Sequence, residues 1–224
     1  MKFSISYFLV TLIFLSYSSA IAQVEQLENQ LKKDPENVTV LLQLGTYYHD
    51  LAGRKKNKPA VKEAAKYLEK ILSLQSEHCL AKVYYGSVLT MKAREAFFPW
   101  KKRGYMREGF RAMDAAVRMC NDQPQVRLIR AINNTTVPLS FSRLPIALAD
   151  FEFIIHSDSQ VVSTLNSDFW APFYYYYGVA LLKNKQDEKA KGMWKQVSTL
   201  YPDSPYTKKA NEQLKILEEH TYVN

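Results

Sequence analysis

Apolar residues recur at helical spacing over most of the chain, and small residues stand at regular places among them. The clearest stretch lies near the C-terminus and contains, in order, Tyr174, Tyr177, Gly178, Leu181, Ala190, Trp194, Val197 and Pro202. Large residues three or four positions apart lie on one face of an α-helix. Pro202 cannot continue a helix, because it has no backbone N–H to donate. The stretch therefore predicts two helices that pack against each other through these faces.

Small residues recur in the same order upstream, which indicates an internal repeat. The earlier pairs are Gly45 with Ala64, Gly86 with Gly109, and Ala131 with Ala147. The interval from one pair to the next is 22 residues between the first and second pairs, and again between the second and third. Because small residues let two helices approach closely, these pairs predict a series of similar helical hairpins.

These positions resemble those of the tetratricopeptide repeat, a helical hairpin of about 34 residues. With Gly178 counted as position 8, the eight residues of the C-terminal stretch fall at positions 4, 7, 8, 11, 20, 24, 27 and 32. All of these are defining positions of that repeat, and the resemblance extends over roughly residues 24 to 219. It implies an all-α fold, a right-handed solenoid of antiparallel helix hairpins with about four such units and N- and C-terminal capping helices.

The chain departs from the repeat in ways that predict insertions. Extra residues fall at 53–59, at 92–111, around Pro138 and Pro145, and at 156–168. We expect the first insertion to be a solvated loop and the second to lengthen a hairpin. Arg127 and Arg130 stand where the repeat usually has apolar residues, so the third unit matches it least well.

Both ends of the repeat region have the pattern of a capping helix. Val24, Leu27 and Leu31 would share one face of a helix over residues 24–33. Ser204 followed by Pro205 is typical of a helix start, and the helix it begins would run to about residue 219. A polar outer face on such end helices keeps a repeat protein soluble.

The first 22 residues have the features of a secretory signal peptide. Lys2 precedes an apolar run over residues 8–15, and Ala-Ile-Ala at 20–22 gives the pattern of small residues that precedes cleavage. The run is shorter than the roughly 18–20 residues that span a bilayer, which favours cleavage over an uncleaved anchor. We expect residues 1–22 to be removed and residues 23–224 to form one exported domain, in the periplasm or otherwise secreted.

Two cysteines, Cys79 and Cys120, lie within the predicted exported region. In an oxidising compartment an even pair is a candidate disulfide. By the repeat count they stand at the adjoining ends of two antiparallel helices, and Pro99 would divide the segment between them into two nearly equal arms. The alternative is two buried free thiols that act as small apolar side chains.

Catalytic and metal-binding patterns are absent from the sequence. The histidines stand far apart, at His49, His78, His156 and His220, and none belongs to an HExxH segment. Neither a nucleophile elbow nor a phosphate-binding glycine loop occurs. We therefore expect a protein that is not an enzyme and that uses no cofactor or metal.

The resemblance implies a ligand groove formed by the first helix of each repeat, at repeat positions 2, 5, 9, 12 and 13. On this chain we select from those positions the candidate binding residues Leu42, His49, Val83, Ser87, Thr90, Leu128, Tyr175, Val179, Leu182 and Lys183. Such a groove suits a helix or an extended apolar peptide of another envelope or secreted protein. The alternative is that the insertions of the chain itself cover part of this face.

The insertion at 92–111 is rich in basic and aromatic residues. It contains seven basic and two acidic residues, together with Phe97, Phe98, Trp100 and Tyr105. The chain as a whole carries a net charge of +8. Trp100, Lys101, Lys102 and Arg103 are candidates for docking to an anionic membrane surface. The alternative to a groove-binding scaffold is therefore a peripheral membrane or secretion-apparatus component that docks through this hairpin. The predicted export disfavours nucleic acid as a partner. The alternative to docking is a lengthened hairpin whose aromatic rings fill a gap between repeats and whose charges are solvated.

Overall fold

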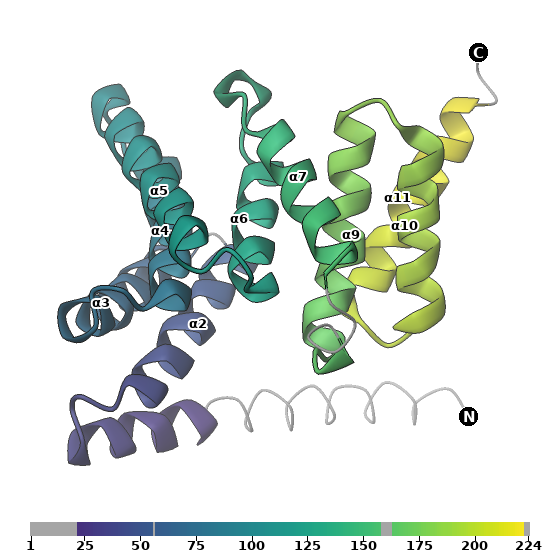
Figure 1. Ribbon diagram of the computed structural model, residues 1–224. Helices are drawn as coiled ribbons and strands as arrows, with labels where there is room; N and C mark the ends of the chain where they lie inside the picture. The colour runs from purple at the N-terminus through teal and green to yellow at the C-terminus, as the bar shows by residue number, and fades with distance from the viewer. Residues whose placement is uncertain (1–21, 56, 158–162, 222–224) are drawn as a thin grey trace, which may run out of the picture. The chain divides into compact units, whose positions relative to one another are not determined.

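The structure is a computed structural model, and it describes residues 22–55, 57–157 and 163–221, which are helical with short connections and contain no strand (Figure 1). The elements are a helix over residues 22–33, α2 (Val38–Lys55), α3 (Lys58–Leu74), α4 (Cys79–Glu95), α5 (Pro99–Met119), α6 (Pro124–Thr136), η1 (Leu139–Phe141), α7 (Leu144–Ile155), α9 (Ser167–Lys183), α10 (Asp187–Leu200) and α11 (Pro205–Thr221). Within these ranges no helix is both long enough and apolar enough to cross a membrane.

Helix starts follow from local side-chain chemistry. The side chains of Asn57, His78 and Asn166 accept hydrogen bonds from the first free backbone N–H groups of α3, α4 and α9. Prolines occupy the first turn of α3, α6 and α7, where a missing N–H costs nothing. These local signals explain why the helix boundaries fall close to the predicted repeat boundaries.

The chain forms two compact units, and the boundary between them falls after Ala112, inside α5. Unit 1 contains the helix over residues 22–33, α2, α3, α4 and most of α5. Unit 2 contains the last turns of α5 and the elements from α6 to α11. The prediction that residues 23–224 form one domain stays a prediction.

In unit 1 the small residues stand where helices pack most closely. A Cβ atom added to Gly45 of α2 would lie 3.0 Å from Leu68 Cδ2 of α3. A Cβ atom on Gly109 of α5 would lie 2.6 Å from the carbonyl oxygen of Gly86 in α4. Ala64 of α3 is fully buried. The first two helix pairs are therefore in the predicted register.

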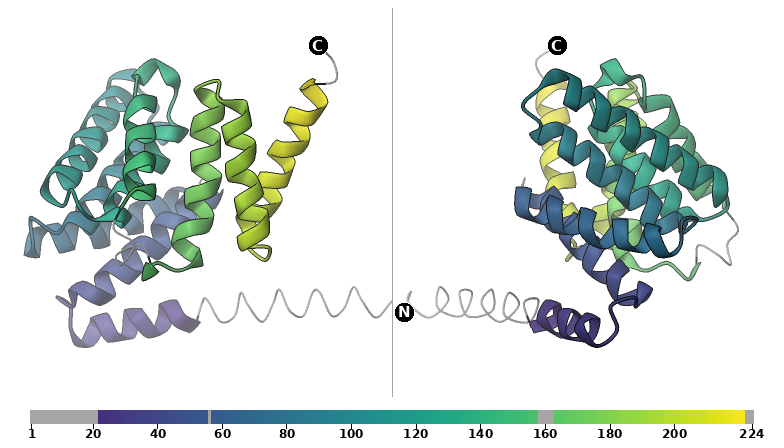
Figure 2. Two further views of the ribbon diagram at one scale, coloured as in Figure 1. Left: turned by 45° about the vertical axis from the view of Figure 1, so that its right-hand side comes forward. Right: turned by 90° about the vertical axis from the view of Figure 1, so that its left-hand side faces the viewer.

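In unit 2 the antiparallel pairs are α6 with α7 and α9 with α10, and α11 packs against α10 and α9 (Figure 2). The core surrounds Phe151, Phe173 and Trp194, each of them 0% exposed. A Cβ atom on Gly178 would lie 2.4 Å from Trp194 Nε1. Trp194 Nε1 also donates a hydrogen bond of 3.0 Å to the carbonyl oxygen of Tyr175. Position 8 is therefore glycine because the indole occupies the space beside it.

The predicted loop at 53–59 is wrong, because helices occupy most of that segment. α2 continues to Lys55 and α3 begins at Lys58, so the extra residues lengthen both helices. Gly53 is exposed and tolerated within α2, and Asn57 supplies the cap that starts α3. The second insertion does lengthen a hairpin, and α5 begins at Pro99, as predicted.

The two predicted end helices are present. Val24, Leu27 and Leu31 pack against the core of unit 1 from the helix over residues 22–33. In α11, Ala210 is 0% exposed, and Leu214 and Leu217 pack against the core of unit 2.

Candidate binding surfaces

In unit 2 α9 packs against α6, the first helix of the preceding pair, and against the end helix α11. One surface of these helices carries partly buried apolar residues and two lysines. We call it the tyrosine–lysine face, and it consists of Ile132, Tyr175, Val179, Leu182, Lys183, Tyr206 and Lys209. Tyr175, Val179 and Leu182 are four and three positions apart, so they lie on one side of α9.

Aromatic rings and an ammonium group join α9 to α11 in this face. The ring centroids of Tyr175 and Tyr206 are 5.5 Å apart. Lys209 Nζ lies 4.9 Å from the Tyr206 centroid and 5.9 Å from the Tyr175 centroid. Burial, with a smaller contribution from the charge of Glu212, raises the pKa of Tyr175. The phenol therefore stays neutral at physiological pH, and the lysine places a positive charge beside it.

Lys183 joins α9 to α6 at the other side of the face. Its Nζ donates a hydrogen bond of 2.5 Å to the carbonyl oxygen of Thr135. Burial lowers the pKa of Lys183. Since an ammonium group has three donor hydrogens, Lys183 can also donate to a carboxylate that approaches from solvent.

The prediction is wrong for four of the groove residues, because their side chains are buried and cannot contact a ligand. Val83 is 0% exposed, Ser87 4%, Thr90 8% and Leu128 4%. Leu128 belongs to the core of unit 2, and the Thr90 methyl group lies close to Gly109 of α5. Of the ten predicted residues, those that keep partial exposure are Leu42, His49, Tyr175, Val179, Leu182 and Lys183. Their role in binding stays a prediction.

His49 bridges two other polar side chains in unit 1. Its Nε2 lies 2.9 Å from Ser87 Oγ, and its Nδ1 lies 3.1 Å from Asp50 Oδ1. These are the groups of a serine-hydrolase triad. Ser87 is almost fully buried in the middle of α4, where helical hydrogen bonds use the backbone N–H groups that an oxyanion hole would need. The arrangement fits a polar bridge between α2 and α4 better than a nucleophile.

A buried charge network in unit 2 accounts for the two arginines that depart from the repeat. Asp150 of α7 is 0% exposed and accepts from Arg127 at 3.0 Å and from Arg130 at 2.8 Å. Asp114 of α5 accepts from Arg130 at 3.1 Å and from Arg143 at 2.6 Å and 3.0 Å. Sequence reasoning missed the two aspartates, although arginines at core positions require buried acidic partners.

An open hollow in unit 1 was also not predicted. It has a volume of about 490 Å³ and lies between the helix over residues 22–33 and the helices α2 and α3. Lys66 and Lys70 line it, but each pairs with a glutamate at 3.1 Å, Glu63 and Glu36 respectively. Lys32 also lines the hollow and donates a hydrogen bond of 3.0 Å to Asn29 Oδ1. Two of the three lysines are therefore paired with carboxylates, and the hollow shows no arrangement specific for a ligand.

The connection between α4 and α5 carries exposed aromatic rings. Phe97 is 88% exposed, Trp100 66% and Phe98 41%. Phe98 and Trp100 stack with ring centroids 4.6 Å apart, and Lys101 Nζ lies 5.7 Å from the Phe98 centroid. The alternative that these rings fill a gap between repeats is wrong for all three. Lys102 and Arg103 are exposed beside them.

Cys79 is the first residue of α4, and Cys120 directly follows α5. Both are disulfide-bonded in the structure. The chain contains no other cysteine.

Comparison with solved structures identifies the fold. The crystal structure of TTC0263, a thermophilic TPR (tetratricopeptide-repeat) protein of Thermus thermophilus, superposes with a TM-score of 0.67. The match covers 92% of this chain and 95% of that one, at 13% sequence identity. This chain has the tetratricopeptide-repeat fold. Such a fold is a helical scaffold typical of protein–protein interaction. No family model matches the sequence, and the search of curated proteins gave no significant match.

Proposed function

We propose that this protein is a non-catalytic scaffold of the cell envelope that binds a segment of another envelope or secreted protein. The observation that carries the proposal is the tyrosine–lysine face of unit 2. It is formed by α6 and α9, the first helices of two successive pairs, together with the end helix α11, and stacked helical repeats use such neighbouring helices as binding surfaces.

The chemistry of this face favours a peptide that combines apolar side chains with acidic groups. Tyr175, Val179 and Leu182 present rings and aliphatic carbon atoms, while Lys183 and Lys209 present ammonium groups at opposite sides. Tyrosines contribute a large contact area with little conformational freedom to lose on binding. A helix or extended strand with apolar side chains and a flanking Asp or Glu matches both features.

The envelope location rests on the signal peptide predicted at residues 1–22, which lies largely outside the described residues. The test is to express the full chain in a bacterial host, separate periplasm from cytoplasm, and sequence the N-terminus. We expect periplasmic protein that begins at Gln23. Cytoplasmic protein that still begins at Met1 would contradict the location and leave the binding proposal intact.

A displayed random-peptide library tests the binding surface with a defined probe. We expect mature protein to enrich peptides with two or more apolar residues next to Asp or Glu. For a synthetic peptide of that consensus, Tyr175→Ala with Leu182→Ala should weaken binding by roughly tenfold or more, since each removes a buried contact. Lys183→Gln should reduce the affinity for acidic peptides more than the affinity for analogues in which Asp or Glu is replaced by its amide.

Tyr174→Ala is the matched control. It removes the same kind of ring from the same helix, but the Tyr174 ring packs against Trp170 and Tyr201, with centroids at 5.8 Å and 6.4 Å, and not against Tyr206. We expect this variant to keep its affinity for the peptide. Equal losses in the control and the double variant, or no enriched peptide at all, would show that the site is not on this face.

A further inference from the structure

The tip of the α4–α5 hairpin presents the most exposed aromatic rings of the described chain. We call residues 97–103 the hairpin tip. Phe97 and Trp100 show 88% and 66% of their surface to solvent, and the Phe98 ring stacks on Trp100 and meets the Phe97 ring edge-on. Exposed rings of this size lower stability and solubility unless a partner covers them. The sequence places them at the turn itself, where Pro99 begins α5.

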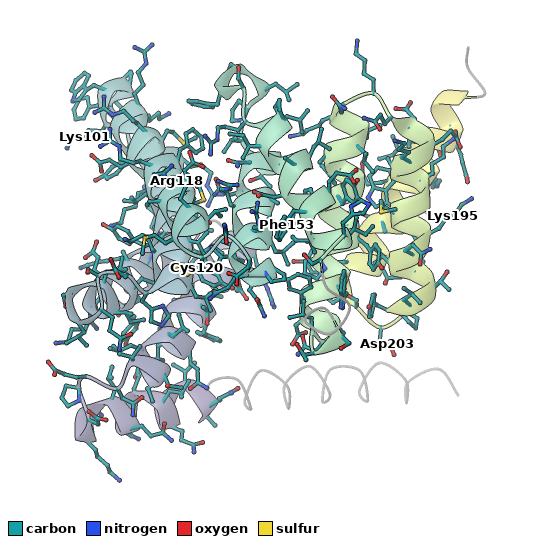
Figure 3. All side chains as sticks on the ribbon, viewed as in Figure 1. Lys101, Arg118, Cys120, Phe153, Lys195 and Asp203 are labelled. Carbon is teal, nitrogen blue, oxygen red and sulfur yellow. The ribbon has the colours of Figure 1, made fainter. Side chains whose placement is uncertain are left out.

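Three basic residues directly follow these rings in the sequence. Lys101, Lys102 and Arg103 are consecutive near the start of α5, and all three are exposed. Figure 3 labels Lys101, which lies near the N-terminal end of α5. A positive first turn is unfavourable with respect to the helix dipole, which favours acidic residues there. The helix dipole therefore does not account for this arrangement of charge.

The three basic residues that directly follow the rings favour a membrane surface over a protein pocket as the partner. A protein pocket that buried Trp100 would also remove water from Lys101 and Lys102, whereas the centres of protein interfaces are depleted of lysine. In the interfacial region of a bilayer the rings enter to a depth of about 5–10 Å, and long basic side chains extend back to the lipid phosphates. Tryptophan in particular prefers this boundary, because its ring is amphipathic.

We propose that the hairpin tip is a membrane-docking site that binds the surface of an anionic phospholipid bilayer. Phe97 and Trp100 insert at the level of the headgroups, and Lys101, Lys102 and Arg103 bind lipid phosphates. The site belongs to unit 1 and shares no residue with the tyrosine–lysine face. Docking at the tip and peptide binding can therefore fail independently.

Vesicle co-sedimentation of the mature protein tests the proposal. The probes are vesicles of phosphatidylcholine alone and of phosphatidylcholine with about 30% phosphatidylglycerol. We expect binding to the anionic vesicles to be at least tenfold tighter, and to fall when NaCl is raised from about 0.1 M to about 0.5 M. Phe97→Ser with Trp100→Ser should weaken binding roughly tenfold or more, because it removes the inserted rings. Lys101→Ala, Lys102→Ala and Arg103→Ala together should have a similar effect.

Two controls separate docking from general effects of charge and folding. Lys189→Ala, Lys195→Ala and Lys208→Ala remove the same charge from exposed positions on α10 and α11, and should leave vesicle binding within about twofold. Trp100→Phe should keep binding but remove the quenching of tryptophan fluorescence by brominated lipid, which places this ring in the bilayer.

Three results would overturn the proposal. One is the absence of binding to anionic vesicles, and another is binding that the tip variants leave unchanged. The third is tip-dependent retention on a polyglutamate column without vesicle binding, which would assign the tip to an acidic protein.

Discussion

Single residues in this protein are constrained most strongly where two helices touch. Gly178 has no room for a side chain because the indole of Trp194 fills the space beside it. Trp194 satisfies its own N–H by donating to the carbonyl oxygen of Tyr175. A large residue on one helix therefore requires a small residue on the facing helix. The recurring large and small residues of the repeat reflect this packing.

Replacing the buried tryptophan should cost much of the stability of unit 2. For Trp194→Ala we expect a loss of about 3–5 kcal/mol in the free energy of unfolding, because the change leaves a large cavity. Chemical denaturation followed by circular dichroism measures it. Lys195→Ala, at the exposed neighbouring position labelled in Figure 3, is the control and should change stability by less than about 0.5 kcal/mol. A loss below about 1 kcal/mol for Trp194→Ala would contradict its role in the core.

Tyr85 should ionise only at strongly alkaline pH. Burial and its hydrogen bond of 3.0 Å to Glu69 raise the pKa of Tyr85 to about 12. Because the folded-state pKa is above the unfolded value, the contribution to stability is complete below about pH 10 and is lost as the pH rises toward 12. A titration of phenolate absorbance, compared between the wild type and Tyr85→Phe, isolates this residue.

The substitution Glu69→Gln tests whether the charge of Glu69 helps to raise the pKa of Tyr85. It keeps a hydrogen-bond acceptor but removes the negative charge, so it should lower the pKa of Tyr85. Glu218→Gln on α11 is the control and should leave the titration unchanged. Ionisation of Tyr85 near pH 10 in the wild type would contradict the combined effect of partial burial and Glu69 on its pKa.

At the scale of elements, α5, α6 and α7 are joined by charged groups where other hairpins use apolar contacts. Arg130 contacts Asp114 of α5 and Asp150 of α7 at once. Burial alone would lower the pKa of Arg130, but hydrogen bonds and charge from both aspartates outweigh it and raise the pKa. The arginines that weaken the repeat pattern are therefore compensated by acidic residues on neighbouring helices.

Removing the central carboxylate should disrupt this junction. For Asp150→Ala we expect a loss of about 3–5 kcal/mol, because Arg127 and Arg130 would keep buried charge without their shared partner. Asp203→Ala, at an exposed position labelled in Figure 3, should cost less than about 0.5 kcal/mol. Denaturant unfolding of both variants checks the prediction, and similar small losses would show that the network contributes little.

At the scale of the whole molecule, the chain is divided into two compact units, and the boundary lies inside α5. Cys79 and Cys120 are both disulfide-bonded, and a bond between them would close a long segment of the sequence that includes all of α5. Such a bond restricts the unfolded chain more than the folded one, and so stabilises the fold.

Thiol counting and reduction test the bridge. Unfolded, unreduced protein should show no reactive thiol, and reduction should lower the free energy of unfolding by about 4 kcal/mol in the chain-entropy model. A Cys79→Ser, Cys120→Ser variant should be unaffected by reductant. Two reactive thiols per chain before reduction would show that the bridge does not form.

The sequence by itself determined the helical class, the register of the hairpins and both end helices. The reason is that these features are written in local signals. Small residues such as Gly178 occur where helices must approach, prolines such as Pro99 start helices, and apolar spacing selects the packed face.

Exposure and long-range pairing were decided only by the tertiary structure. Val83 and Leu128 have the spacing of groove residues but are buried, since burial depends on what packs over a position. The partners of Arg127 and Arg130 come from α5 and α7, which no local pattern links to them. The solvent exposure of Phe97 and Trp100 likewise depends on the absence of packed neighbours, a property of three-dimensional position that the order of residues does not contain.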